Sequence, residues 1–432
     1  MTEAARREPG PAGLFFVLSA RHDPAARMFN VDLLTALIAI LLPWSTTGVV
    51  IAAALWVVAL VPTLEVEAFL RSLKRPICAL PIALFALALV GTLWSNVPWG
   101  ERLYGVGPTA KLLLLPLLLY HSERSARGLW VFIAFLASCL VLMVVSWLVA
   151  LDPALSLKLY LARGADKFAN GIVVKNYIDQ SQEFVLCAVA LFYPAVALLR
   201  ANRIWPALLL VALALGLAAS LIFVSVSRTA LVTTPVMLAA FALLHLKWRN
   251  IVIIACAAAV MAGLAWTTSP RLRGTVETFL SDYKHYSERN IPTSSGLRLV
   301  FWQKSLRFIS EAPLLGHGTG SIHALFEEAA VGQFGADAEV VANPHNQTLN
   351  VAIQWGAIGI AVLYAMWLVH LLLFRGDGLA AWIGLMVVVQ NIFTSLFNSH
   401  LFDFHEGWMY VLGVGVAGGM VLRARRRDAS AE

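Results

Sequence analysis

Residues 129–150 read LWVFIAFLASCLVLMVVSWLVA, an apolar run that begins just after Arg124 and Arg127. A helix that crosses a membrane needs about 20 mostly apolar residues, so this stretch predicts one span. Similar runs recur along a chain that is 59% hydrophobic, and the predicted fold class is therefore all-α, a polytopic membrane protein. We expect about 12 transmembrane helices, at residues 31–45, 47–63, 77–94, 105–120, 129–150, 183–200, 204–223, 229–246, 250–267, 346–373, 379–398 and 407–422.

Three of these spans are short. The first two can form one hairpin bent at Pro43, and the fourth is predicted to be broken or tilted, because Pro108, Lys111 and Pro116 interrupt it. Apart from Lys111, the span centres are nearly free of charge. This pattern argues against a transporter or flippase, which would place ionisable groups at mid-span.

Positive charges alternate between connections. Basic residues near the ends of spans stay on the cytoplasmic side, a rule that holds for short connections but not for long ones. Both termini are therefore predicted to be cytoplasmic, and the long segments at about 151–182 and 268–345 to lie on the outer face. The basic residues behind this assignment are Arg6, Arg7, Arg21, Arg27, Arg71, Lys74, Arg75, Arg124, Arg127, Arg200, Arg203, Lys247, Arg249, Arg375, Arg423, Arg425, Arg426 and Arg427.

This topology divides the chain into five parts. The cytoplasmic N-terminus (1–30) contains an apolar stretch, Leu14–Leu18, that is too short for a signal peptide and can form an interfacial helix. Transmembrane helices one to nine (31–267) precede a large outer loop with surface helices (268–345), which is too long for a passive connection. Transmembrane helices ten to twelve (346–422) and a basic cytoplasmic tail (423–432) complete the chain. The net charge of +7 is explained by cytoplasmic loops facing anionic membrane lipids and requires no nucleic acid.

Two patterns that resemble functional motifs are interpreted as structural. The four cysteines all fall in predicted spans and form no C-x-x-C pair, so we interpret them as small hydrophobic residues. The G-x-G-x-x-G match at 413–418 lies inside the last span with no strand before it. Gly415 and Gly419 therefore indicate close helix packing, and no nucleotide-binding fold is expected. The cysteines are Cys78, Cys139, Cys187 and Cys256.

Arg228 lies between two predicted spans with almost no loop, in the sequence Ser225-Val226-Ser227-Arg228-Thr229. At the outer boundary of the membrane an arginine is costly unless it is paired or reaches the interface. Two interpretations are open. Arg228 is either a snorkelling anchor, or part of an anion site in which its rigid fork of donors binds phosphate and Ser227 adds a hydroxyl.

Within the large outer loop, residues 296–310 predict a helix with an apolar stripe and basic residues off it. This helix either lies on the membrane surface with its basic groups toward lipid headgroups, or packs on the spans. The stretch Pro313–Gly320 (PLLGHGTG) then predicts a tight turn that lacks the Gly-Lys-Ser/Thr of a Walker loop. The stripe consists of Leu299, Trp302, Leu306 and Ile309, and the basic residues are Arg298, Lys304 and Arg307.

Asn343-Pro344-His345-Asn346 leads into the tenth span, a helix-entry signal that predicts His345 on the first turn. An imidazole with an ordinary pKa of about 6.5 suits a general base at neutral pH. His345 is expected to share the outer face with Arg228 and Arg298, which favours a catalytic role over a structural one.

The connection before the last span, 398–406, holds four potential metal ligands. Their spacing matches no H-E-x-x-H or similar motif, so we expect no metal there, and Asp403 can instead orient a histidine or an arginine. Arg163 and Lys175, in the other long segment, can bind sugar or phosphate or be ordinary solvated residues. The four potential ligands are His400, Asp403, His405 and Glu406.

In this order and spacing, the motifs resemble the O-antigen ligase family, within the wider group of Wzy-like polymerases and ligases. The resemblance rests on the span count, Ser-x-Ser-Arg-Thr at 225–229, Arg298-x-x-x-Trp302 before the turn at 313–320, and His345-Asn346. It implies an inner-membrane glycosyltransferase of the C-type architecture with a periplasmic active site. Such ligases move O-antigen from undecaprenyl diphosphate onto the lipid A-core oligosaccharide, without nucleotide, metal or other cofactor.

By motif match, the resemblance implies that Arg228 and Arg298 bind the donor diphosphate and that His345 is the essential histidine. Asp403 is matched only by its place before the last span. The residue chemistry agrees, because a departing diphosphate needs cations near its developing charge and the acceptor hydroxyl needs a base. Direct displacement by that hydroxyl would invert the anomeric centre.

One close alternative is an O-antigen or exopolysaccharide polymerase, which uses the same lipid-linked donor with another acceptor. A protein O-oligosaccharyltransferase is disfavoured, because those relatives usually carry an extra outer domain after the last span, whereas only a short basic tail follows Leu422. The donor glycan, the acceptor hydroxyl and the oligomeric state are not predicted from the sequence.

Overall fold

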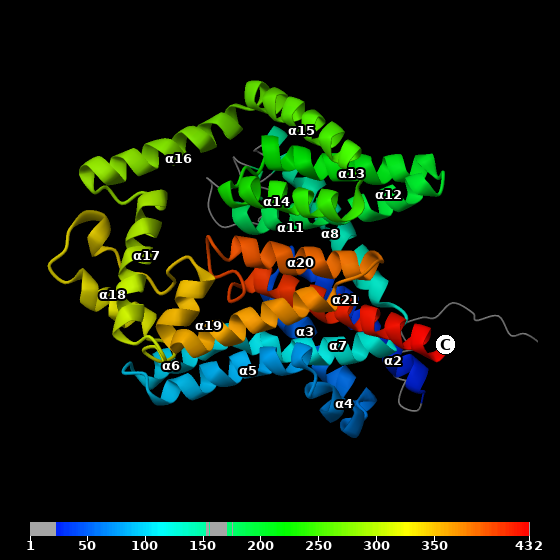
Figure 1. Cartoon of the computed structure of the whole chain (residues 1–432), viewed down its shortest axis with the longest axis horizontal. Coiled ribbons are helices and arrows are strands. Elements are labelled where there is room, and N and C mark those ends of the chain that lie inside the picture. The colour runs from blue at the N-terminus through cyan, green and yellow to red at the C-terminus, as the bar shows by residue number, and fades with distance from the viewer. Residues whose placement is uncertain (1–22, 153–154, 156–170, 175, 432) are drawn as a thin grey trace, which may run out of the picture.

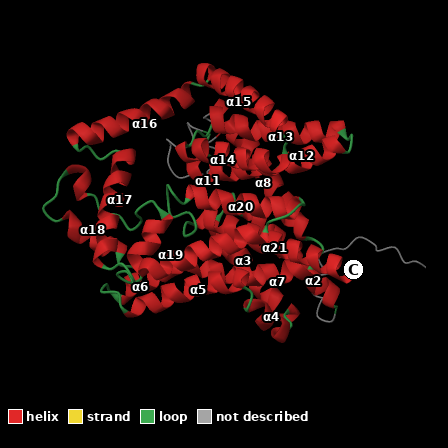
Figure 2. Cartoon of the chain, in the orientation of Figure 1, coloured by secondary structure: helices red, strands yellow, loops and turns green. Residues whose placement is uncertain are grey.

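The computed structural model describes residues 23–152, 155, 171–174 and 176–431, and these residues form helices and connections with no strand (Figure 2). The candidate interfacial helix at Leu14–Leu18 lies outside the described residues. The α-helices are α2 (Pro24–Leu41), α3 (Thr46–Leu60), α4 (Val66–Leu73), α5 (Pro76–Val90), α6 (Trp99–Val106), α7 (Leu114–Arg124), α8 (Gly128–Leu151), α11 (Tyr177–Ala190), α12 (Phe192–Arg200), α13 (Ile204–Phe223), α14 (Arg228–His245), α15 (Trp248–Thr268), α16 (Pro270–Arg289), α17 (Ser294–Glu311), α18 (Ile322–Ala330), α19 (Gln347–Leu373), α20 (Leu379–Thr394) and α21 (Phe404–Ala431).

Eleven of the described helical segments are long and apolar enough to cross a membrane, and α20 is a further apolar helix of 16 residues. Together they correspond to the twelve predicted spans. The predicted fold class, an all-α polytopic membrane protein, is therefore confirmed.

Both predicted irregularities are present. α2 and α3 are separated by a turn at Pro43, where Nε1 of Trp44 donates to Oγ of Ser138 at 2.8 Å, midway along α8. The fourth span is broken into α6, a 3₁₀ stretch at Gly107–Leu113 and α7. Lys111 lies in this 3₁₀ stretch, and its ammonium donates to the carbonyls of Phe402 at 2.8 Å and Asp403 at 2.6 Å.

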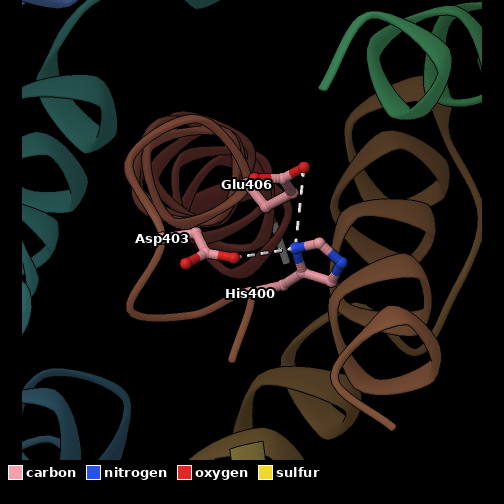
Figure 3. A group of neighbouring side chains, drawn as sticks. All are labelled: His400, Asp403 and Glu406. Carbon is pink, nitrogen blue, oxygen red and sulfur yellow. Dashed lines mark ion pairs between the residues drawn. The ribbon is translucent and has the colours of Figure 1, made fainter. Parts of the chain in front are cut away.

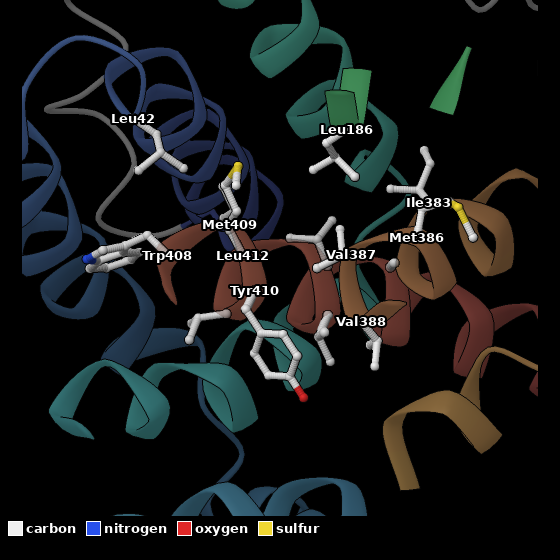
Figure 4. Packing of buried hydrophobic residues seen from close by; sticks show 14 of the residues in the cluster. Leu42, Leu186, Ile383, Met386, Val387, Val388, Trp408, Met409, Tyr410 and Leu412 are labelled. Carbon is white, nitrogen blue, oxygen red and sulfur yellow. The ribbon is translucent and has the colours of Figure 1, made fainter. Parts of the chain in front are cut away.

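The core of the bundle forms where α21 packs between α7 and α20 (Figure 4). Glycines of α21 allow this close approach, as predicted. A Cβ added at Gly415 would lie 2.6 Å from Cβ of Leu118, and one at Gly419 would lie 2.5 Å from Cβ of Ser122. The cysteines are also as expected, since all four are free thiols, although Cys256 is exposed.

The predicted lack of charge concerned the span centres, whereas buried ionisable side chains lie at the starts of α11 and α21. α11 begins at Tyr177 and α21 at Phe404, earlier than the predicted spans, and the added turns carry buried ionisable side chains. One pair among them is explicit, because Nδ1 of His405 lies 2.7 Å from Oδ2 of Asp179. Ionisable groups are tolerated at such depth when they are paired inside the bundle.

The segment 268–345 is joined to the bundle by an exchange of backbone hydrogen bonds inside α19. Gly356 has a non-helical conformation (φ 57°, ψ −151°) that interrupts the helical ladder. The freed carbonyls of Ile353 and Gln354 accept from the N–H groups of His317 (2.8 Å) and Gly318 (2.9 Å). In return, the carbonyls of Pro313 and Leu314 accept from the N–H groups of Ala357 (2.9 Å) and Ile358 (3.5 Å). The turn predicted at Pro313–Gly320 thus completes the broken helix, which satisfies buried backbone groups that would otherwise be costly.

The helix predicted at 296–310 is present as α17, but its buried face is not the predicted stripe. Leu306 is 61% exposed, whereas Phe301 and Phe308 are buried. The reason is that α17 packs against α18 and the first turns of α19, which form a small apolar core of their own. This core contains Phe301, Phe308, Ile322, Phe326 and Ile353. Helices α16, α17 and α18 lie at the end of the bundle opposite the C-terminal end of α21 (Figure 1).

We expect Gly316→Ala to destabilise the protein. Gly316 has φ +65°, and an added Cβ would lie 2.5 Å from the carbonyl carbon of Gln354. The left-handed conformation alone costs an alanine about 1–2 kcal/mol, and the clash adds to this. Gly100→Ala is the matched control, because Gly100 is exposed on α6 and an added Cβ would meet nothing within 4 Å. The thermal midpoint in detergent should fall for Gly316→Ala alone; equal midpoints for the two variants would contradict the docking described above.

Candidate active site

A pocket of about 420 Å³ lies where α14 begins. α13 ends at Phe223 and α14 starts at Arg228, so the connection is short, as the sequence indicated. Ser227 is the N-cap of α14, and its Oγ accepts from the N–H of Ala230 at 3.4 Å. Three arginines from three helices line the pocket, together with Tyr177 and several hydroxyl groups. They are Arg228 of α14, Arg271 of α16 and Arg298 of α17.

The guanidinium of Arg228 is held by two other helices. Both of its terminal nitrogens lie 3.0 Å from Oδ2 of Asp282 on α16. Nη1 also donates to the hydroxyls of Ser294 at 2.9 Å and Ser295 at 3.0 Å, at the start of α17. Arg228 is therefore a paired arginine in a defined orientation. Sequence reasoning did not single out Asp282, because nothing in its local sequence separates it from the other acidic residues of the segment.

Arg298 lies close enough to Arg228 for their charges to repel. Burial lowers the pKa of Arg298, Tyr177 partly opposes this effect, and the nearby Arg228 charge adds to it. Like charges held together in a partly desolvated site favour binding of an anion, which would offset their repulsion. The two arginines predicted from the sequence, with Arg271 as a third, thus form a cationic pocket.

His345 lies immediately before α19 rather than on its first turn. Asn346 is the N-cap, with its Oδ1 accepting from the N–H of Leu349 at 3.1 Å, and His345 precedes it with φ +54°. The prediction that His345 lies on the first turn of the helix was therefore wrong, because His345 precedes the N-cap residue. This conformation is uncommon for a residue with a side chain. It turns the imidazole onto the ring of Phe301 from α17, with centroids 6.1 Å apart and an interplanar angle of 24°.

The environment of His345 keeps its imidazole neutral at pH 7. Burial lowers the pKa of His345, and the positive charges of Arg298 and His400 lower it further, while Asn398 and Asp403 act in the opposite direction. The stacking on Phe301 places the imidazole against α17, the helix that also carries Arg298. A neutral imidazole beside an anion site is what a general base requires.

The connection before α21 approaches His345 from the other side. Oδ1 of Asn398 lies 2.9 Å from Nδ1 of His345, and Nδ2 of Asn398 donates to Oδ2 of Asp403 at 2.6 Å. The candidate Asp403 is thus connected to His345 through Asn398, which the sequence analysis did not single out.

Three of the four potential metal ligands, His400, Asp403 and Glu406, lie close together (Figure 3). Nδ1 of His400 lies 3.3 Å from Oδ2 of Asp403 and 3.6 Å from Oε1 of Glu406, and the ligand atoms are all within 4.8 Å of one another. Burial disfavours the charged form of His400, but Glu406 and Asp403 outweigh it and raise the pKa of His400 to about 10. A histidine binds metal in its neutral form. The protonated His400, with the Lys111 ammonium on the carbonyl of Asp403, makes this cluster an ion-paired group.

The structure describes three of the remaining candidates, Ser227, Asn346 and Trp302. Arg163 and Lys175 lie outside the described residues. Ser227 and Asn346 serve as N-caps, although Ser227 also lines the pocket. Trp302 is half-buried, and its Nε1 has no hydrogen-bond partner among the described residues.

The fold and this site define a class of protein: a polytopic helical membrane protein with a cationic pocket and a neutral histidine at one end of its helix bundle. The family model described as O-antigen ligase matches residues 213–364, a stretch that contains all three pocket arginines and His345. The predicted resemblance to the O-antigen ligase family is confirmed over that stretch. A comparison with curated proteins finds no match.

We expect activity to persist in excess EDTA. The reason is that Glu406 and Asp403 raise the pKa of His400, so a metal ion would have to displace a stabilised proton from this imidazole. Transfer assays with and without EDTA, at a fixed detergent and lipid composition, measure this directly. Loss of activity that a single divalent ion restores would show that the cluster binds metal.

Proposed function

We propose that this protein is an O-antigen ligase, which transfers O-antigen polysaccharide from undecaprenyl diphosphate to a sugar hydroxyl of the lipid A-core oligosaccharide. The single observation that carries the proposal is the convergence of three arginines on one pocket, with His345 stacked on Phe301 of the same helix as Arg298. The family match to residues 213–364 supports the reaction class. The donor and the acceptor are inferences from that class.

The pocket suits the leaving group. As the glycosidic bond to phosphorus-bound oxygen breaks, its electron pair stays on the diphosphate, which leaves as an anion. Arg228 and Arg298 bind this diphosphate, with the guanidinium of Arg228 oriented by Asp282. The repulsion between the two arginines falls as negative charge develops between them. The pocket therefore stabilises the transition state more than it stabilises the bound donor.

His345 acts as the general base. Its imidazole accepts the proton of the acceptor hydroxyl while that oxygen forms the new bond to the anomeric carbon. Because the attacking oxygen and the departing diphosphate lie on opposite sides of this carbon, the product has the inverted configuration. No metal and no nucleotide takes part in these steps.

The site is proposed to be periplasmic. Basic residues concentrate in the short connections and tail that the positive-inside rule places in the cytoplasm. Helices α16, α17 and α18 lie at the other end of the bundle from the C-terminal end of α21 (Figure 1), and α16 and α17 carry two of the pocket arginines. This arrangement supports both termini in the cytoplasm and an active site beyond the outer leaflet of the inner membrane.

The proposal is tested by reconstitution of the purified protein in lipid vesicles with an undecaprenyl-diphosphate-linked glycan and rough lipopolysaccharide. We expect the glycan to appear on lipopolysaccharide, because the anion site handles the donor and the base activates the acceptor. Vesicles without lipopolysaccharide are the control. Elongation of the glycan on its polyprenyl carrier, with nothing on lipopolysaccharide, would assign the protein as a polymerase instead.

In the same assay, we expect His345→Ala to abolish transfer and Arg298→Ala to lower its rate by about 10²–10³-fold, as for loss of one charge-stabilising donor. Two exposed residues provide matched controls. Arg307 lies on the same helix as Arg298 and pairs only with Glu311 at 3.0 Å among the described residues, and the side chain of His323 on α18 is 53% exposed. Arg307→Ala and His323→Ala should retain wild-type rates. Near-normal transfer by His345→Ala, in correctly inserted protein, would refute the general-base role.

A further inference from the structure

The hydrogen bonds around Asn398 leave its amide only one orientation. Its Nδ2 faces Oδ2 of Asp403 at 2.6 Å, and a carboxylate oxygen can only accept. Its Oδ1 faces Nδ2 of Asn343 at 2.9 Å. The orientation of Asn343 is fixed in turn, because its Oδ1 accepts from the N–H of His345 at 2.9 Å and from the hydroxyl of Ser399 at 2.7 Å. The oxygen of Asn398 therefore faces both Asn343 and His345.

This orientation determines which nitrogen of His345 carries the proton. Nδ1 of His345 lies 2.9 Å from Oδ1 of Asn398, which offers only lone pairs, so Nδ1 must be the donor. In a neutral imidazole the other nitrogen, Nε2, then bears the free lone pair. The ring cannot turn freely to reverse these roles, because Phe301 stacks on its face and the backbone of His345 is held at φ +54° by the bond to Asn343.

We propose that Asn398 is a positioning residue, which holds His345 in the Nδ1–H tautomer and so presents Nε2 to the acceptor hydroxyl. The inference rests on the proposed role of His345 as the base and names the residue on which that role depends. Asp403 supports the arrangement one step further away, since it fixes the amide of Asn398 without touching His345 in a hydrogen bond. His345 is thus hydrogen-bonded to Asn398, Asn398 to Asp403, and Asp403 is paired with His400.

The hydrogen bond between His345 and Asn398 also affects how the transfer rate depends on pH. The charged groups that act on His345 are Arg298 from α17 and His400 and Asp403 from the connection before α21. Burial lowers the pKa of His345 the most, and the hydrogen bond from Nδ1 to Asn398 raises it. A general base works in its neutral form, so the rate should fall as the pH drops through this pKa. Removing the acceptor should therefore move the acidic limb of the profile to lower pH.

The test compares two substitutions of similar size. Asn398→Leu removes the acceptor, and we expect kcat to fall by about 10²-fold, the lower end of a general base's contribution, with the KM for the lipid-linked donor unchanged. The acidic limb of its residual activity should shift to lower pH. Asn398→Asp keeps an oxygen that accepts from Nδ1, and a proton shared between its second oxygen and Oδ2 of Asp403 replaces the amide donor, so its rate should recover to within about tenfold of wild type. Gln333→Glu adds a carboxylate at an exposed position and should change neither quantity.

The outcomes separate a positioning role from a structural one. Equal losses in Asn398→Leu and Asn398→Asp, or a leucine variant with wild-type rate and profile, would overturn the inference. Thermal midpoints of all variants in detergent show whether a loss reflects misfolding, and the aspartate variant keeps the test decisive if the leucine variant is unstable. If His345→Ala is inactive while Asn398→Leu is normal, this inference alone fails. If His345→Ala is active, the proposed function fails with it.

Discussion

The position of the candidate site depends on one exchange of backbone hydrogen bonds. Gly356 breaks α19 inside the bundle, and the turn at 313–318 supplies the donors and acceptors that the break leaves open. Unsatisfied backbone groups at this depth are expensive, so the break and the turn stabilise each other. Because α17 leads into this turn and His345 precedes α19, the exchange brings Arg298 and His345 into one site. Glycines are required on both sides, since a Cβ at Gly316 or Gly356 would meet backbone atoms of the other segment.

The site keeps an excess of positive charge in a pocket that is partly desolvated. Asp282 pairs with Arg228, but three arginines line the pocket, and Arg298 is destabilised by burial and by its neighbour. Such an arrangement costs stability in the free protein and is offset when an anion binds. Burial lowers the pKa of His345 the most, and the charge of Arg298 lowers it further, which favours the neutral imidazole. One electrostatic arrangement thus serves both proposed roles, binding of the leaving group and activation of the acceptor.

The ionisable side chains at the start of α11 and α21 are best understood as support for this arrangement. Ion pairs connect α11, α21 and the connection before α21. They are Asp179 with His405, and His400 with both Asp403 and Glu406. The ammonium of Lys111 in the broken fourth span binds the carbonyl of Asp403. These groups hold the connection that carries Asn398 beneath His345. Buried charge in the bundle therefore does not by itself indicate a transport pathway, because these groups are paired with one another close to the candidate site.

The sequence by itself determined the fold class and the helices, because twelve apolar runs leave a chain no soluble alternative and each run forms its own hydrogen bonds locally. It also singled out candidates for the site, Arg228 and His345 at span ends and Arg298 on a helix of the long outer segment. It could not determine the buried face of α17, since that face is decided by α18 and α19 rather than by local periodicity. Nor could it identify Asp282, Arg271 or Asn398, whose roles come from partners far away in the chain. Only the tertiary structure decided these contacts, because hydrogen-bond direction and the repulsion of like charges depend on distances that sequence spacing does not contain.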